Sequence, residues 1–178
     1  RRVLFRSSLV GCLYYLTNNS RPDIAFSVHQ CARYTHHPKQ SHSKAVKRIV
    51  RYLLETKDKG LILSPTKEIT LDLYVDADFA GLWNSNADKQ VLVRVKSRSG
   101  HVLLLGNCPM LWSSKLQSQI VLSTTEAEYI ALSMSLCKVL PLMQIIRDLR
   151  KEAFDFTATT PKVHCKVFED NSSGVLKL

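Results

Sequence analysis

The sequence contains no paired cysteine motif and no long apolar run. Its five cysteines are scattered singly, with no C-x-x-C pair and an odd count. This pattern argues against a disulfide framework and a zinc knuckle and indicates a reducing, intracellular setting. No uninterrupted apolar run approaches the roughly 20 residues that cross a bilayer, and no segment resembles a signal peptide. We therefore expect a protein that neither spans a membrane nor is secreted.

Acidic residues are also few relative to basic ones. The sequence has 15 Asp and Glu residues against 25 Lys and Arg residues, for a net charge of +10. This excess favours a polyanionic partner such as nucleic acid, although many basic proteins are merely soluble. The 178 residues suffice for one ordinary domain or for a small domain with a helical appendage.

Both ends of the chain are expected to be cut. Residues 1–7 (RRVLFRS) look like the conceptual translation of a short-read sequencing adaptor, so we expect an artefact there and exclude it from fold reasoning. Residues 171–178 open what should be another helix and supply no terminus for it. The sequence therefore predicts a C-terminally truncated domain.

Residues 8–60 have helical periodicity, with a break at 18–22. Near the end of this segment, apolar residues at i, i+3, i+4 and i+7 define one helix face, and basic residues repeat that spacing on the other. The apolar face comprises Val46, Ile49, Val50 and Leu53, and the basic face comprises Lys44, Lys47, Arg48 and Arg51. The basic face is either an ordinary solvated surface or a phosphate-binding one.

After Gly60 the pattern changes to short strands. Gly106 and Asn107 predict a turn between two of them, so an antiparallel meander is expected. Alternation in 91–98 indicates either a strand or an ordered insertion. The predicted strands are 61–63, 69–75, 99–105, 110–121 and, after a helical stretch, 163–168.

The helical stretch begins at Ser123, which has capping-box spacing with Glu126. Pro141 either kinks this helix or begins a second one. The element order over residues 61–178 is therefore three strands, a helix and a further strand.

Acidic residues fall where a metal site could form: Asp76 near one strand end, Glu128 in the helix and Asp170 after the last strand. Such positions can converge although they are far apart in sequence. Clustered carboxylates need cations, and hard ions such as Mg²⁺ prefer oxygen ligands and support phosphodiester hydrolysis. Plainer roles remain, because Glu126 is expected only to cap the helix and Asp170 could equally be a cap. Asp78 is either a turn residue or a neighbour of the metal ligands.

Cys31 and the nearby histidines do not predict a zinc site, because they flank Pro38 in a polar connection without rigid four-ligand geometry. Trp112 is expected to pack on the sheet instead of stacking on a base. The histidines concerned are His36, His37 and His42.

Several long motifs, in one order, resemble the Pol polyprotein of copia-type LTR retrotransposons. TNNSRPDIAFSVHQCARYTHHPKQSHSKAVKRIVRYLLETKDKGLIL resembles the segment joining polymerase to ribonuclease H. YVDADFAG, SRSGHVLLLGNCPMLWSSKLQSQIVLSTTEAEYIAL and VFEDN resemble the ribonuclease H core. The resemblance implies a helical end of reverse transcriptase at 8–60. It also implies a ribonuclease H-like fold at 61–178, incomplete at the C-terminus: an α/β domain, more closely an α+β fold, with a mixed five-stranded sheet.

By the same resemblance, Asp76 in YVDAD, Glu128 in EAEY and Asp170 in FEDN are the catalytic residues and metal ligands. They would bind two Mg²⁺ ions, with Mn²⁺ able to replace them. The family's fourth acidic residue lies further downstream and is expected to be missing, which leaves the activity of this fragment open. His101 departs from the family pattern, since a tyrosine is usual there.

The implied function is two-metal hydrolysis of the RNA strand of RNA·DNA hybrids during reverse transcription. The basic residues Lys44, Lys47, Arg48 and Arg51 would bind the hybrid's phosphates. The implied partners are the hybrid and the rest of the polyprotein, reverse transcriptase and integrase, with no membrane, in cytoplasmic virus-like particles. The alternative is a catalytically inactive nucleic-acid-binding remnant. Another nuclease or integrase on the same fold and a domesticated host protein also remain open.

Overall fold

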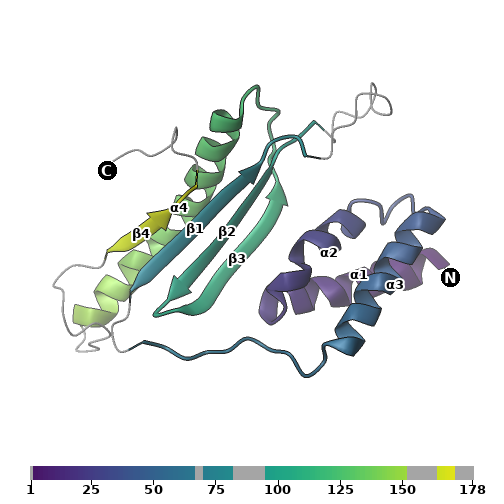
Figure 1. Cartoon of the computed structure of the whole chain (residues 1–178), viewed down its shortest axis with the longest axis horizontal. Coiled ribbons are helices and arrows are strands. Elements are labelled where there is room, and N and C mark those ends of the chain that lie inside the picture. The colour runs from purple at the N-terminus through teal and green to yellow at the C-terminus, as the bar shows by residue number, and fades with distance from the viewer. Residues whose placement is uncertain (1, 67–69, 82–94, 152–163, 171–178) are drawn as a thin grey trace. The chain divides into compact units, whose positions relative to one another are not determined.

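The computed structural model describes residues 2–66, 70–81, 95–151 and 164–170, and the chain divides into two compact units, Arg1–Ile62 and Leu63–Leu178 (Figure 1). The first unit is helical. Its elements are α1 (Arg2–Asn19), the 3-10 helix η1 (Pro22–Ile24), α2 (Ala25–Ala32) and α3 (Gln40–Glu55).

The first unit has its own apolar core, in which residues from all of its helices meet. The predicted break at 18–22 is confirmed, since α1 ends at Asn19 and Pro22 begins η1, where its missing N–H costs nothing. The buried apolar core residues are Val10, Leu13, Ile24, Val28, Val46 and Ile49.

The second unit contains a four-stranded mixed sheet of order β3-β2-β1-β4 (Figure 1). The β1–β2 and β2–β3 pairs are antiparallel, whereas β4 pairs with β1 in parallel. The predicted α+β class with a mixed sheet is therefore confirmed. The strands are β1 (Leu71–Asp78), β2 (Arg98–Leu105), β3 (Cys108–Leu116) and β4 (Cys165–Phe168).

The hairpin between β2 and β3 turns at Gly106 and Asn107, both with positive φ (55° and 67°), as two-residue hairpin turns require. This prediction is confirmed. The strand predicted at 61–63 is wrong, because this segment has no regular structure and pairs with no described strand. Of the segment 91–98, residues 91–94 lie outside the described residues, as does the helix expected at 171–178.

One long helix, α4 (Thr124–Lys151), packs along one face of the sheet (Figure 1). Pro141 lies inside it, so the alternative that a second helix begins there is wrong. Ala131, Val139 and Ile146 of α4 are buried against the apolar face of β1 and against Leu103 of β2. The helix thus closes the second core.

Among the described residues, α4 is also the one helix long and apolar enough to cross a membrane by length and composition. An 18-residue window within Thr124–Leu149 has a mean hydropathy of 1.6, and 22% of that window is buried. A helix of a soluble protein can pass the same test, and the buried positions of α4 pack on the sheet. The expected absence of a membrane partner stays a prediction.

Candidate carboxylate site and basic helix face

Asp76 lies near the carboxyl end of β1, an inner strand that pairs with β2 in antiparallel and with β4 in parallel. Leu71, Leu73 and Val75 are buried beneath α4, and Asp76 belongs to the alternate, solvent-exposed set. Successive side chains of a strand point to opposite faces. Asp76 is therefore open to solvent and accessible to a ligand.

Asp170 follows β4, the parallel neighbour of β1. The last paired residues of the two strands are Tyr74 and Phe168, whose rings stack with centroids 4.7 Å apart and planes at 11°. Asp76 lies two residues beyond Tyr74, and Asp170 lies two residues beyond Phe168. Extending the register by those two residues places the aspartates level with each other at the carboxyl ends of adjacent strands.

Glu128 lies in the first turns of α4, on the helix that covers the other face of the sheet. Its neighbour Glu126 has the predicted capping role: Ser123 Oγ accepts a hydrogen bond from Glu126 N–H (3.1 Å), and the Glu126 carboxylate accepts one from Leu122 N–H (2.8 Å). This prediction is confirmed, and Glu128, two residues further on, is half-buried.

The three predicted ligands are not gathered into one metal-binding group. Within the described part of the chain, no three His, Cys, Asp or Glu side chains come close enough together to hold a metal ion. One physical reason is the alternation in β1, which puts Asp76 on the face away from α4, whereas Glu128 belongs to α4. Asp76 and Asp170 still fit Mg²⁺ chemically, because this ion commonly binds through one or two carboxylates with water completing its shell.

Asp78 is the last residue of β1 and lies just before a turn. Its carboxylate lies against Gly81, where a Cβ atom would collide with both carboxylate oxygens. Between them, Ala80 has a positive φ of 49°, an uncommon conformation for a residue with a side chain. The chain therefore turns sharply straight after the strand that carries Asp76.

The basic face predicted for α3 is present. Val46 and Ile49 are buried in the first core, and Val50 and Leu53 pack against it. The opposite side of the helix is exposed and carries Lys44, Lys47, Arg48 and Arg51. The helix therefore has the two faces that its sequence predicts, and the basic one is accessible to a polyanion.

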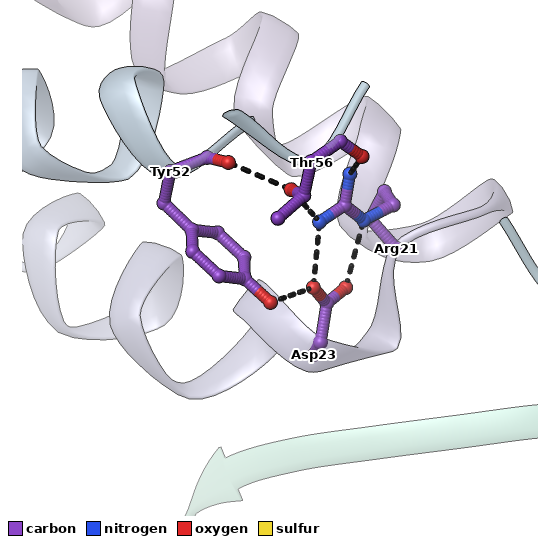
Figure 2. Close-up of polar contacts among 4 residues, drawn as sticks. All are labelled: Arg21, Asp23, Tyr52 and Thr56. Carbon is purple, nitrogen blue, oxygen red and sulfur yellow. Dashed lines mark hydrogen bonds and ion pairs between the residues drawn. The ribbon is translucent and has the colours of Figure 1, made fainter. Parts of the chain in front are cut away.

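An arginine-centred network holds the end of α3 (Figure 2). Arg21 donates to both carboxylate oxygens of Asp23 (3.0 and 2.7 Å) and to the carbonyl and hydroxyl oxygens of Thr56 (3.1 and 2.8 Å). The Tyr52 hydroxyl donates to Asp23 (2.8 Å), and the guanidinium lies 5.5 Å from the Tyr52 ring centroid. Because the last carbonyls of a helix lack internal donors, Arg21 caps α3.

This network also shifts the titration of its charged members. Hydrogen bonds from Arg21 lower the pKa of Asp23, against the opposing effect of burial, and the Tyr52 hydroxyl lowers it further. The hydrogen bond with Asp23 raises the pKa of Arg21 in turn. The pair is therefore ionised at neutral pH, which strengthens its hydrogen bonds.

Sequence reasoning missed this network. The Arg-Pro-Asp spacing hints at a local ion pair, but Thr56 lies 35 residues further along the chain and no sequence pattern identifies it as the partner.

Of the three histidines near Pro38, His42 has a local structural role. His42 Nδ1 accepts a hydrogen bond from Lys39 N–H (3.1 Å) at the start of α3. The His42 ring stacks on Tyr34 with centroids 4.1 Å apart.

In the sheet, Trp112 lies half-buried on β3 opposite Val102.

Comparison with known proteins identifies relatives over most of the chain. It is 37% identical over 157 residues (88% of the chain) to the retrovirus-related Pol polyprotein from transposon RE1 of Arabidopsis thaliana. It is 40% identical over 121 residues (68% of the chain) to the corresponding polyprotein from transposon RE2 of the same plant. These matches span only 10% and 8% of the two polyproteins.

A third relative is much shorter. The secreted RxLR effector protein 161 of Plasmopara viticola is 36% identical over 126 residues, which is 71% of this chain and 82% of that protein. No protein-family model and no solved structure match the chain. On the similarity to transposon polyproteins over most of its length, the chain belongs to the family of copia-type retrotransposon Pol polyproteins.

Proposed function

We propose that the unit Leu63–Leu178 is the ribonuclease H module of a retrotransposon Pol polyprotein and cleaves the RNA strand of RNA·DNA hybrids. The observation that carries this proposal is the parallel β1–β4 pair, which brings Asp76 and Asp170 to the same strand end. Three antiparallel strands, a helix and a parallel strand agree with the order that the ribonuclease H-like fold requires. Membership of the Pol family supplies the biological setting.

We assign the metal ions to Asp76, Glu128 and Asp170. The structure does not gather the three side chains, so metal binding would have to draw Glu128 to the two strand-end aspartates. When bound, Mg²⁺ supplies an activated water and neutralises charge on the phosphodiester. The chain contributes the positions of its oxygen ligands: Asp76 and Asp170 from neighbouring strand ends, and Glu128 from the helix that starts at the same edge (Figure 1). Mn²⁺ would serve as a substitute because it accepts the same ligands.

The basic face of α3 would bind the phosphates of the hybrid. Lys44, Lys47, Arg48 and Arg51 are all exposed. Basic side chains that contact phosphates release counterions, so binding by this face should weaken steeply as salt is added. Recognition of the RNA strand would rest on helix shape and 2′-hydroxyls and not on base sequence.

The proposal also includes the setting of the reaction. The partners would be the hybrid and the remainder of the polyprotein, reverse transcriptase and integrase, within cytoplasmic virus-like particles. Residues 8–60 would be the end of the reverse transcriptase, joined to the ribonuclease H module.

The test is Mg²⁺-dependent cleavage of a labelled RNA·DNA hybrid. Three proteins are compared: this chain, a form extended past Leu178 in the native reading frame, and the extended form with Asp76→Asn. Asp72→Asn is the matched control, because Asp72 is on the same strand and face but lies away from the strand end. Cleavage that Asp76→Asn abolishes and Asp72→Asn retains supports the proposal. Equal activity of the two variants would overturn the assignment of Asp76.

The second candidate is a catalytically inactive nucleic-acid-binding remnant. The match to 82% of effector protein 161 favours it, because nearly all of a protein that is not named as a polyprotein corresponds to this stretch. A remnant would bind the hybrid through the basic face of α3 but show no Mg²⁺-dependent cleavage in the extended form.

A further inference from the structure

A buried side-chain amide, that of Gln117, links three elements at the end of the sheet where Asp76 lies. Gln117 follows β3 directly and is 1% exposed. Its side-chain Nε2 donates to Ser99 Oγ (2.9 Å) and to the carbonyl oxygen of Ala127 (2.7 Å). Its backbone N–H donates to the carbonyl of Ser97 (2.9 Å). One residue thereby ties the beginning of β2 and the end of β3 to the first turn of α4.

The bonded atoms lie next to the proposed ligands. Ser99 pairs with Ala77 in the β1–β2 register, one residue from Asp76. Ala127 immediately precedes Glu128 in α4. The Gln117 side chain therefore connects the part of β2 that lies beside Asp76 to the turn of α4 that carries Glu128.

The same network reaches the turn after β1. Ser97 is fully buried, and its Oγ accepts a hydrogen bond from the backbone N–H of Ala80 (3.3 Å). The sharp turn that follows Asp76 is thus fixed to the segment that Gln117 holds. Gln117 and Ser97 together therefore connect β2, β3, the turn after β1 and the first turn of α4.

The amide makes two hydrogen bonds but leaves one of its own atoms unpaired. Gln117 Oε1 is buried and has no hydrogen-bond partner among the described residues, which lowers the net contribution of the amide to stability. A methionine of similar volume would remove this unpaired acceptor together with the hydrogen bonds to Ser99 and Ala127. What the amide adds is direction, because its two N–H groups fix where the Ala127 carbonyl lies relative to β2.

We propose that Gln117 is a positioning residue that holds the first turn of α4, and with it Glu128, at the level of Asp76. This inference rests on the proposed function, in which Glu128 and Asp76 bind the same metal ions. Gln117 itself is buried and touches neither metal nor substrate.

The test compares Gln117→Met with the control Val139→Ala. Val139 is also buried in α4 but lies several turns away from the network. Two readouts are measured: amide hydrogen exchange in residues 126–129, and the Mg²⁺ midpoint for stabilisation against heat and for hybrid cleavage by the extended form. Gln117→Met should speed exchange in this turn and raise the Mg²⁺ midpoint by about tenfold, as loss of a residue supporting metal ligands commonly does. The KM for the hybrid should not change.

Val139→Ala should lower the thermal midpoint without either effect. Unchanged exchange in the first turn of α4, or an Mg²⁺ midpoint that rises equally in both variants, would overturn the positioning role while leaving the proposed function intact. Absence of both cleavage and Mg²⁺ stabilisation in the unsubstituted extended form would overturn the proposed function, and the positioning role with it. The unsubstituted extended form thus distinguishes a failure of the positioning role from a failure of the proposed function.

Discussion

Replacing Arg21 by methionine should destabilise the first unit by about 2 to 3 kcal/mol. The two hydrogen bonds to Thr56, which is 9% exposed, contribute about 1 kcal/mol each. The ion pair with Asp23 contributes only about 0.5 kcal/mol, because the Asp23 side chain is 38% exposed and solvent screens the pair. Methionine keeps much of the packing of the arginine stem against Tyr52, so the loss reports the guanidinium.

The assay is urea unfolding of the whole chain followed by two probes. Both tryptophans, Trp83 and Trp112, belong to the second unit, so their fluorescence reports that unit, whereas helical circular dichroism reports both. Arg21→Met should move the dichroism transition and leave the fluorescence transition in place. Lys47→Met, an exposed substitution on α3, is the control. A loss from Arg21→Met no larger than that of Lys47→Met would refute the reasoning.

The pH dependence of the same network has a definite sign. The folded pKa of Asp23 lies below its unfolded value, because Arg21 and Tyr52 donate hydrogen bonds to the carboxylate. Its contribution is therefore complete above about pH 5 and disappears as the pH falls below about 4, through the folded pKa. The stability difference between the unsubstituted chain and Asp23→Asn should shrink over that range. A difference that stays constant down to pH 3 would contradict the assignment.

Three further experiments test other parts of the molecule. Ser123→Ala should cost about 1 kcal/mol in urea unfolding by removing the helix cap, and no loss would show that the cap is dispensable. Asn107→Val should lower the thermal midpoint because a β-branched residue is strained at a φ of 67°, whereas Asn107→Gly should not. Lys47→Gln with Arg51→Gln should reduce the salt slope of hybrid binding, measured by anisotropy, by about 2. An unchanged slope would exclude this face.

Local features of the fold could be predicted from the sequence because their causes are local. The faces of α3 follow from apolar spacing, the Gly106–Asn107 turn from residues that tolerate positive φ, and the Ser123 cap from a side chain beside free N–H groups. Residues 61–63 show the limit of this approach. They are apolar, yet Ile62 and Leu63 are 81% and 64% exposed, because a strand needs a partner that sequence periodicity does not supply.

Long-range features could not be predicted in this way. No residue near Arg21 in the sequence indicates that Thr56 is its hydrogen-bond partner. The pattern around Gln117 likewise does not predict that its side chain is buried. The candidate site could be predicted in part, since its residues were identified but their arrangement was not. The resemblance to a known family singled out Asp76, Glu128 and Asp170, and side-chain alternation in β1 puts Asp76 on the face of the sheet away from α4, which carries Glu128. The register of β1 with β4 then decides which two carboxylates are neighbours.

The parallel β1–β4 pair has a consequence for folding order. More than half of the chain's length separates Asp76 from Asp170, and β4 adds only the four residues Cys165–Phe168 to the sheet. Pairings of such high contact order form late, because the loop must close before its contacts are gained. The antiparallel pairs β1–β2 and β2–β3 join segments that are closer in sequence, so they can form before β4 docks. Whatever chemistry Asp76 and Asp170 share therefore begins only once this last strand has docked, so a nascent chain cannot act before its sheet is complete.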